Sequence, residues 1–153
     1  MRHTFSIVVF APSDPNTLQS VTDALTDDRS VIIPCGSENI LWAAVQRQRI
    51  DVVIVNLEKP FEDAYRLLSE IQTKAPQAEV IFVAEFDPEI LSTWMEVIQR
   101  GAYEFLPKPF DPDELKFQVL RAIEKHHRLE LRKRPPAASI RRQDQTLSKR
   151  AAV

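Results

Sequence analysis

The stretch IDVVIVNLEKP, residues 50–60, has the features of a strand at the centre of an α/β protein. Its apolar residues, Val52 to Val55, follow one another without alternation, which is typical of a parallel strand covered on both faces. The run ends on a polar residue, Asn56, and enters a short loop that contains Pro60. The carboxyl end of a central strand is where α/β proteins place ligands and chemistry, often with a reactive acid. Here the position holds an amide that cannot ionise.

Similar apolar runs recur along the chain, separated by segments with helical periodicity. The expected strands are residues 5–11, 30–35, 51–56, 79–84 and 103–107. The expected helices are residues 16–28, 37–49, 61–75, 87–101 and a last one that begins at Asp111 and Pro112. This alternation predicts an α/β fold, a five-stranded parallel sheet with helices on both faces. The common order of five such strands is 2-1-3-4-5.

The carboxyl ends of the expected strands meet at one edge of the sheet, where a site would lie. The residues there are Ala11 to Asp14, Asn56 to Glu58, Ala84 to Phe86, and Lys108 with Pro109. The chain has only two glycines, which argues against a glycine-rich loop that would hold the phosphates of a nucleotide. No histidine pair at metal-binding spacing and no Ser-His-Asp candidate is present. We therefore expect neither a cofactor nor a metal.

The charge of the chain is divided unevenly. Residues 1–126 carry 12 Lys/Arg and 20 Asp/Glu, whereas residues 127–153 carry eight Lys/Arg and two acids. This predicts one acidic domain over 1–126, followed over 127–153 by a basic helix extension and a flexible tail. A single cysteine, Cys35, is typical of a reducing compartment, so a cytoplasmic protein is expected. No apolar run approaches the roughly 18 residues of a membrane span.

Two motifs resemble those of a known family. The segment GAYEFLPKPFDPDEL, residues 101–115, resembles the end of a response-regulator receiver domain of the CheY-like family. IDVVIVNLEKP is similar to the third strand of that family, with its proline four residues after the site. The resemblance covers about residues 4–126. It implies a flavodoxin-like fold and a role in two-component signalling, in which a histidine kinase phosphorylates an aspartate at the end of the third strand with the help of Mg²⁺.

Position by position, the phosphorylation site that the resemblance implies is incomplete. The acceptor position is Asn56, and the hydroxyl position falls on Ala84, or on the next residue if the register slips by one. Of the acid pair that holds Mg²⁺ only Asp14 is left, while Lys108 and Phe105 match the family's lysine and its aromatic switch residue. An amide lacks the anionic oxygen that attacks phosphorus, and Mg²⁺ prefers charged oxygen ligands. We therefore expect a non-enzymatic pseudo-receiver.

Alternatives to this interpretation remain open at the sequence level. Asp14 or Glu58 could act as a substitute acceptor acid, which would make the chain a true phosphorylation switch. Lys108 is expected to pair with Asp14 or Glu58, or to hydrogen-bond Asn56. The basic tail raises the possibility of binding nucleic acid or another anionic partner, although it carries no aromatic residue for stacking on bases.

The resemblance also implies a docking face, made by the fourth helix, the fifth strand and the fifth helix, for a protein partner or a second copy. Four apolar residues of the helix expected over 87–101 share one helical face, which we expect to pack on the sheet. They are Leu91, Trp94, Met95 and Ile98. Ile90 and Val97 flank that face and are expected to widen it toward a partner. Phe105 is either a switch or a packed core residue.

Overall fold

The computed structural model describes residues 4–61 and 63–133, with side chains up to residue 125. The strands are β1 (Phe5–Phe10), β2 (Ser30–Cys35), β3 (Val52–Leu57), β4 (Glu79–Glu85) and β5 (Glu104–Lys108). The helices are α1 (Pro15–Leu25), α2 (Glu38–Arg47), α3 (Asp63–Lys74), α4 (Ile90–Gln99) and α5 (Pro112–Lys133). Every strand boundary lies within one residue of the boundary expected from the apolar runs.

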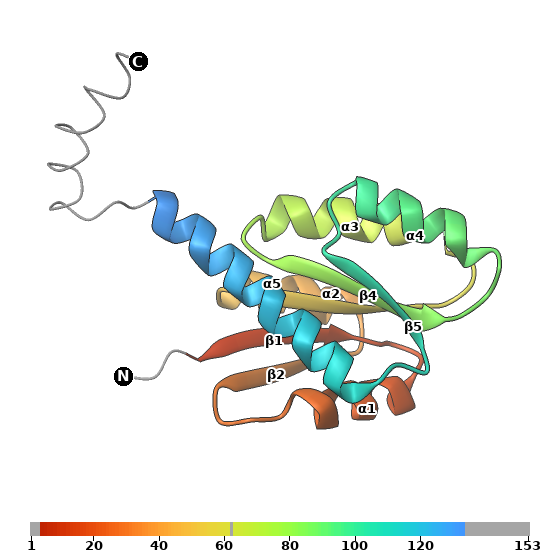
Figure 1. Cartoon of the computed structure of the whole chain (residues 1–153), viewed down its shortest axis with the longest axis horizontal. Coiled ribbons are helices and arrows are strands. Elements are labelled where there is room, and N and C mark those ends of the chain that lie inside the picture. Colours follow the sequence, from red (N-terminus) through yellow and green to blue (C-terminus); the bar gives the residue numbers. More distant parts are fainter. Residues whose placement is uncertain (1–3, 62, 134–153) are drawn as a thin grey trace, which may run out of the picture.

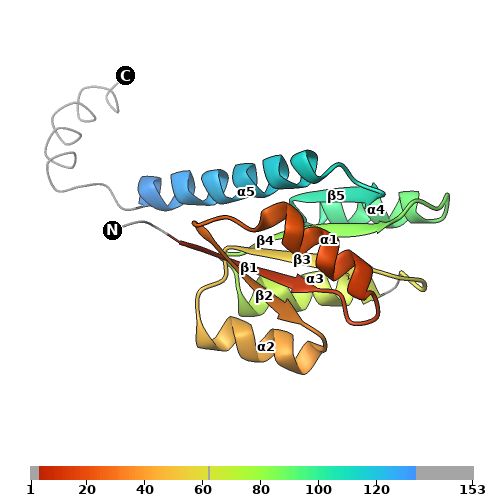
Figure 2. The same cartoon turned by 90° about the horizontal axis from the view of Figure 1, so that it is seen from below.

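The five strands form one parallel sheet in the order β2-β1-β3-β4-β5, which confirms the predicted fold class. Helices cover both faces of the sheet, and the last turns of α5 project beyond it (Figures 1 and 2). Within the described residues, no helix is both long and apolar enough to cross a bilayer.

Successive residues of the central strands point to opposite faces of the sheet, and both faces are packed. Val53 and Val55 contribute to the core under α2, α3 and α4. Val52 and Ile54 contribute to the core under α1 and α5. This double burial is the reason why β3 reads as an unbroken apolar run. By the same alternation, Asn56 lies on the face of α1 and α5.

The expected core face of α4 was wrong. Ile90 and Val97, assigned to the surface, are fully buried, whereas Met95 is 64% exposed. Leu91 and Ile98 are also exposed, and Trp94 is partly buried against the core. The two candidate faces are adjacent on the helix and both are apolar, except that the true one contains Thr93. Periodicity alone therefore could not choose between them, and packing against the sheet did.

The predicted start of the last helix is confirmed, because the Asp111 carboxylate accepts a hydrogen bond from the amide of Asp113 at 2.9 Å. From Pro112 the helix runs without interruption to Lys133, across the boundary proposed at residues 126 and 127. That boundary remains a prediction. Residues 134–153 lie outside the described residues, so the structure does not test the tail or its proposed nucleic-acid binding.

Candidate functional site

Asp14 and Thr17 open the site at the beginning of α1. Asp14 is the residue before the helix, Pro15 occupies the first helical position, and Thr17 is the third residue of the helix. The Asp14 carboxylate accepts a hydrogen bond from the Thr17 amide at 2.9 Å and another from the Thr17 hydroxyl at 2.6 Å. This is the arrangement of a helix N-cap, and it fixes the carboxylate at the carboxyl end of β1.

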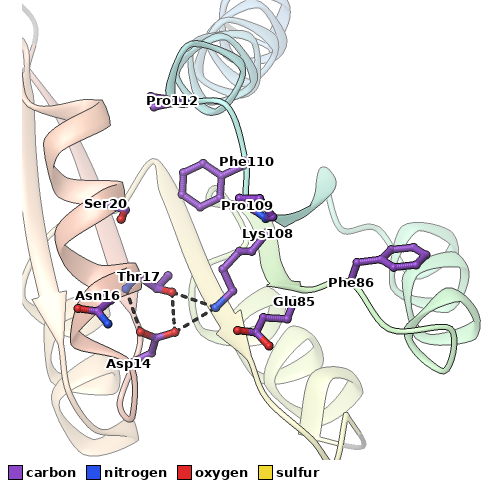
Figure 3. A pocket seen from close by; sticks show the side chains of 10 residues that line it. All are labelled: Asp14, Asn16, Thr17, Ser20, Glu85, Phe86, Lys108, Pro109, Phe110 and Pro112. Atoms are coloured by element: carbon purple, nitrogen blue, oxygen red, sulfur yellow. Dashed lines mark hydrogen bonds and ion pairs between the residues drawn. The ribbon is translucent and has the colours of Figure 1, made fainter.

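Lys108 connects three segments of the chain through one ammonium group. It extends from the end of β5 toward the start of α1 (Figure 3). Its Nζ atom donates to Asn56 Oδ1 at 2.7 Å, to Thr17 Oγ1 at 2.9 Å and to Asp14 Oδ2 at 3.0 Å. An ammonium group has three N–H donors, and each has an acceptor here. Of the expected Lys108 contacts, those with Asp14 and Asn56 are present.

These contacts act on the ionisation of Asp14. The hydroxyl and amide of Thr17, together with the Lys108 ammonium, lower the pKa of Asp14 from 3.8 to about 2. Hydrogen bonds and a nearby positive charge both favour the charged carboxylate. Asp14 and Lys108 therefore form an ion pair whose side chains are only 24% and 14% exposed.

Asn56 is 7% exposed and uses only one side of its amide. Its Oδ1 accepts from Lys108, while its buried Nδ2 has no hydrogen-bond partner among the described residues. The orientation of the amide follows from Lys108, because an ammonium group requires the oxygen rather than the nitrogen. A carboxylate at this position would place a second anionic oxygen where Nδ2 lies, without a donor to stabilise it.

The remaining predicted site residues do not join this network. Ala84 is fully buried in the core under α2, α3 and α4, and it has no hydroxyl to offer. Glu58 is exposed in the loop after β3. The three acceptors of Lys108 leave no hydrogen bond for Glu58. Of the alternative partners expected for Lys108, Glu58 is the one that the lysine does not contact.

Phe105 is packed rather than exposed. It is 1% exposed, its ring stacks on that of Trp94 with centroids 5.0 Å apart, and it also stacks on Phe82 with centroids 6.2 Å apart. Trp94 thus ties α4 to β5 through an aromatic pair. Whether Phe105 has a switching role stays a prediction.

Thr17 is the functional residue that the sequence interpretation missed. Its side chain is 5% exposed and it both donates to Asp14 and accepts from Lys108. Asp14 followed by Pro15 is a helix-start signal that would have placed Thr17 where its amide meets the cap, but the helix was expected to begin at residue 16. That signal does not reveal the second use of the hydroxyl, since the acceptor role depends on a lysine 91 residues away in the chain.

A pocket of about 630 Å³ leads from solvent to Lys108. Its walls come from α1, from the end of β4 and from the segment between β5 and α5 (Figure 3). The lining residues are Asp14, Asn16, Thr17, Ser20, Glu85, Phe86, Lys108, Pro109, Phe110 and Pro112.

The residues at this site do not fit the Mg²⁺ ion that the family resemblance implies. Asp14 Oδ2 and Asn56 Oδ1 are engaged by the Lys108 ammonium, and Asp14 is the one carboxylate of the network. Among the side chains that the structure describes, which end at residue 125, no group of three or more His, Cys, Asp and Glu is placed to hold a metal. A divalent cation would have to displace an ammonium group that is covalently attached to the chain.

The depressed pKa of Asp14 predicts a pH dependence. The ordinary value is 3.8 and the folded value about 2, so the stabilisation is complete above about pH 4 and is lost as the pH falls toward 2. A shift of this size corresponds to about 2 kcal/mol. Asp14→Asn can still cap the helix but has no carboxylate to titrate. Between about pH 4 and pH 2 its free energy of unfolding should therefore fall by about 2 kcal/mol less than that of the unmodified protein. Urea unfolding of both proteins at several pH values measures this difference. If their free energies of unfolding fell in parallel as the pH is lowered, the prediction would be contradicted.

Comparison of the sequence with known proteins points to the same family as the two motifs. Residues 8–120, more than half of the chain, match the family model of the response regulator receiver domain. The DNA-binding transcriptional regulator NtrC of Azospirillum brasilense is 29% identical over 131 residues, which are 85% of this chain and 25% of that protein. The NtrC of Bradyrhizobium sp. (strain RP501 Parasponia) is 38% identical over 91 residues, 58% of this chain and 18% of that protein. The chain thus spans a quarter or less of the length of these curated relatives.

Comparison with solved structures also finds response regulators. A response regulator from Thermotoga maritima has a TM-score of 0.70 and 25% identity, covering 79% of this chain and 98% of that chain. NtrX from Brucella abortus has a TM-score of 0.70 at 23% identity, covering 98% of this chain and 30% of that chain, and this likeness concerns the fold alone. Together with the family match over residues 8–120, the fold and the lysine at the end of β5 lead to one assignment. The chain belongs to the response regulator receiver domain family.

Proposed function

We propose that this receiver domain works without phosphorylation, as a binding module for another protein chain. The observation that carries the proposal is the contact of Lys108 Nζ with Asn56 Oδ1 at 2.7 Å. It joins the lysine to a neutral amide at the position where family members carry the acceptor aspartate. The amide is a poor nucleophile, and Ala84 offers no hydroxyl to a phosphoryl oxygen. The three parts of the reaction that are altered, acceptor, metal ligands and hydroxyl, support the same conclusion independently.

The direct test is exposure to a small phosphodonor, such as acetyl phosphate, with Mg²⁺, followed by intact-mass measurement. We expect no phosphoryl group on the protein. We also expect no saturable binding of beryllofluoride with Mg²⁺ at a dissociation constant below about 1 mM, which corresponds to roughly 4 kcal/mol. A receiver that retains its aspartate serves as the positive control for the reagents. Incorporation of a phosphoryl group, on Asp14 or Glu58 for example, would overturn the proposal and restore the phosphorylation switch.

Asn56→Asp is expected to remain unphosphorylated in the same assay. The substitution repairs the acceptor, but it supplies neither the second metal-binding acid nor the hydroxyl at position 84. It also places two carboxylates, at positions 14 and 56, beside one ammonium group, and one carboxylate oxygen is then buried without a donor. The variant should be about 1–3 kcal/mol less stable than the unmodified protein in urea unfolding at pH 7. Phosphoryl uptake by this variant would show that the rest of the site is intact.

An apolar strip on α4 supports the docking part of the proposal. The α4 stripe consists of Leu91, Met95 and Ile98, which are 49%, 64% and 38% exposed. It lies on the side of α4 that faces β5, because its neighbour Trp94 stacks on Phe105. At the C-terminal end of α4, Arg100 lies over the ring of Tyr65 in α3, so this end of the helix contacts α3. A second chain that covers the α4 stripe would bury apolar area that is now in water.

A second copy of the chain is the first partner to test. Light scattering at micromolar concentration should give the mass of a dimer, and Met95→Glu should return it to the mass of a monomer. The interface should bury at least about 1,000 Å² in total. Thr73→Glu is a suitable control, because it adds the same charge to α3, away from the stripe. A monomer mass for the unmodified protein would remove self-association and leave a different protein as the partner for the α4 stripe.

A further inference from the structure

We propose that Asp14 Oδ2, Thr17 Oγ1 and Asn56 Oδ1 form an oxygen cage for a primary ammonium ion. Lys108 fills this cage from within the chain, and a free alkylammonium ion will fill it when the lysine side chain is shortened. The inference concerns the same site as the proposed function but is tested separately. Phosphorylation of the unmodified protein would overturn the proposed function, whereas failure of the amine to bind would overturn the cage.

The geometry of the cage matches one ammonium group. The three oxygens lie 3.0, 2.9 and 2.7 Å from the same nitrogen, all within the ordinary range of N–H···O hydrogen bonds. The direction of every hydrogen bond is determined. The Thr17 hydroxyl donates its proton to Asp14 Oδ2 and is left with a lone pair, which accepts from Lys108. A guanidinium group is planar and would not present three N–H bonds around a single nitrogen.

The charge of the cage also matches a monovalent cation. Its oxygens come from one carboxylate, one hydroxyl and one amide, so its formal charge is −1. One ammonium group makes the site neutral, whereas Mg²⁺ would leave an excess positive charge on neutral ligands and would lack the anionic oxygens it prefers. Asn56 is therefore suited to a site whose cation is a lysine, because an aspartate there would leave an excess charge of −1.

Small amines have a route to the cage. Lys108 is 14% exposed and lines the pocket of about 630 Å³ that also contains Ser20 and Phe110 (Figure 3). Lys108→Ala retains Cβ and removes three carbons and the nitrogen. The missing atoms correspond to n-propylammonium, so this ion would restore both the apolar stem and the three N–H donors.

The test is the thermal unfolding of Lys108→Ala in n-propylammonium chloride or in tetramethylammonium chloride at equal concentration. We expect propylammonium to raise the Tm, because a ligand that binds the folded state stabilises it by mass action. The rise should be saturable and should reach half of its maximum at about 10 mM. Tetramethylammonium has no N–H donor and should not raise it. Equal Tm values in the two salts would overturn the cage.

Three matched proteins show where the amine acts. The unmodified protein should not respond, because Lys108 already fills the cage. Lys108→Met should not respond either, because its side chain occupies the path of the stem. Lys108→Ala combined with Thr17→Val, which replaces the hydroxyl by a methyl of similar size, should lose most of the response. A full response in this double variant would exclude Thr17 from the site.

A measurement on the unmodified protein covers the case in which Lys108→Ala does not fold at any amine concentration. Correlation of the ammonium protons with ¹⁵N in lysine should reveal one signal, that of Lys108, which persists at neutral pH while exposed lysines lose theirs to exchange with water. Thr17→Val should shift that signal. If no lysine ammonium signal is protected, Lys108 is not held as described and the inference fails.

Discussion

Val97→Glu should unfold the domain or cost at least about 4 kcal/mol of its free energy of unfolding. Val97 has no exposed surface and belongs to the core between α4 and the sheet. A carboxylate there would be buried in the same apolar cluster as Ile90 and Phe105. Chemical denaturation followed by circular dichroism at pH 7 measures the loss.

Met95→Glu is the matched control, since it places the same charge on the same helix two residues earlier. Met95 is 64% exposed, so within a single chain, measured at a protein concentration too low for self-association, this change should alter the free energy of unfolding by no more than about 0.5 kcal/mol. If the two variants were equally stable, the rotation of α4 about its axis would differ from the one described here. Assignment of the α4 stripe to the surface would then be wrong as well.

Lys108→Met should be the second most damaging change, with a loss of about 2–4 kcal/mol. Methionine keeps most of the length of the stem but removes the ammonium group, so Asp14 retains a partly buried charge without its cation and Asn56 Oδ1 loses its donor. Removal of one partner from a fully buried ion pair costs about 3–5 kcal/mol, and the partial exposure of this pair lowers that figure.

Lys59→Met provides the comparison. Lys59 pairs with Asp87 at 2.5 Å and with Glu89 at 3.7 Å, but its side chain is 55% exposed. Ion pairs of this kind contribute little to stability, and urea unfolding of Lys59→Met should be hard to distinguish from that of the unmodified protein. Equal losses for the two lysine variants would mean that the network around Lys108 is no stronger than a surface contact.

The strands could be predicted closely because each is apolar on both sides, and such runs have few alternatives in a chain this polar elsewhere. The start of α5 was equally clear, because Asp111 and Pro112 carry local signals that do not depend on the rest of the fold. The face of α4 could not be predicted from its sequence. Apolar residues outnumber the positions that the core accepts, and a polar residue, Thr93, sits at one of those positions with 6% exposure.

The site was predictable in its members but only partly in its contacts. Asn56 and Lys108 lie at the carboxyl ends of β3 and β5, and Asp14 follows β1, so the order of the strands brings the three residues to the same edge of the sheet. The contact of Thr17 with Lys108 depends on the length of the lysine side chain and on the position of α1 over the sheet edge. Those quantities are properties of the packed molecule, and the sequence pattern around Thr17 gives only its role at the start of a helix.

The attachment of the Lys108 ammonium to β5 sets its effective concentration at the site. A dissolved ion binds from solution, so the fraction of sites that it occupies depends on its concentration. A group carried on the chain stays at the same high local concentration however dilute the protein is. Under the proposed function, in which the domain loads neither Mg²⁺ nor a phosphoryl group, chelators, cellular magnesium and phosphodonors would leave the state of this site unchanged.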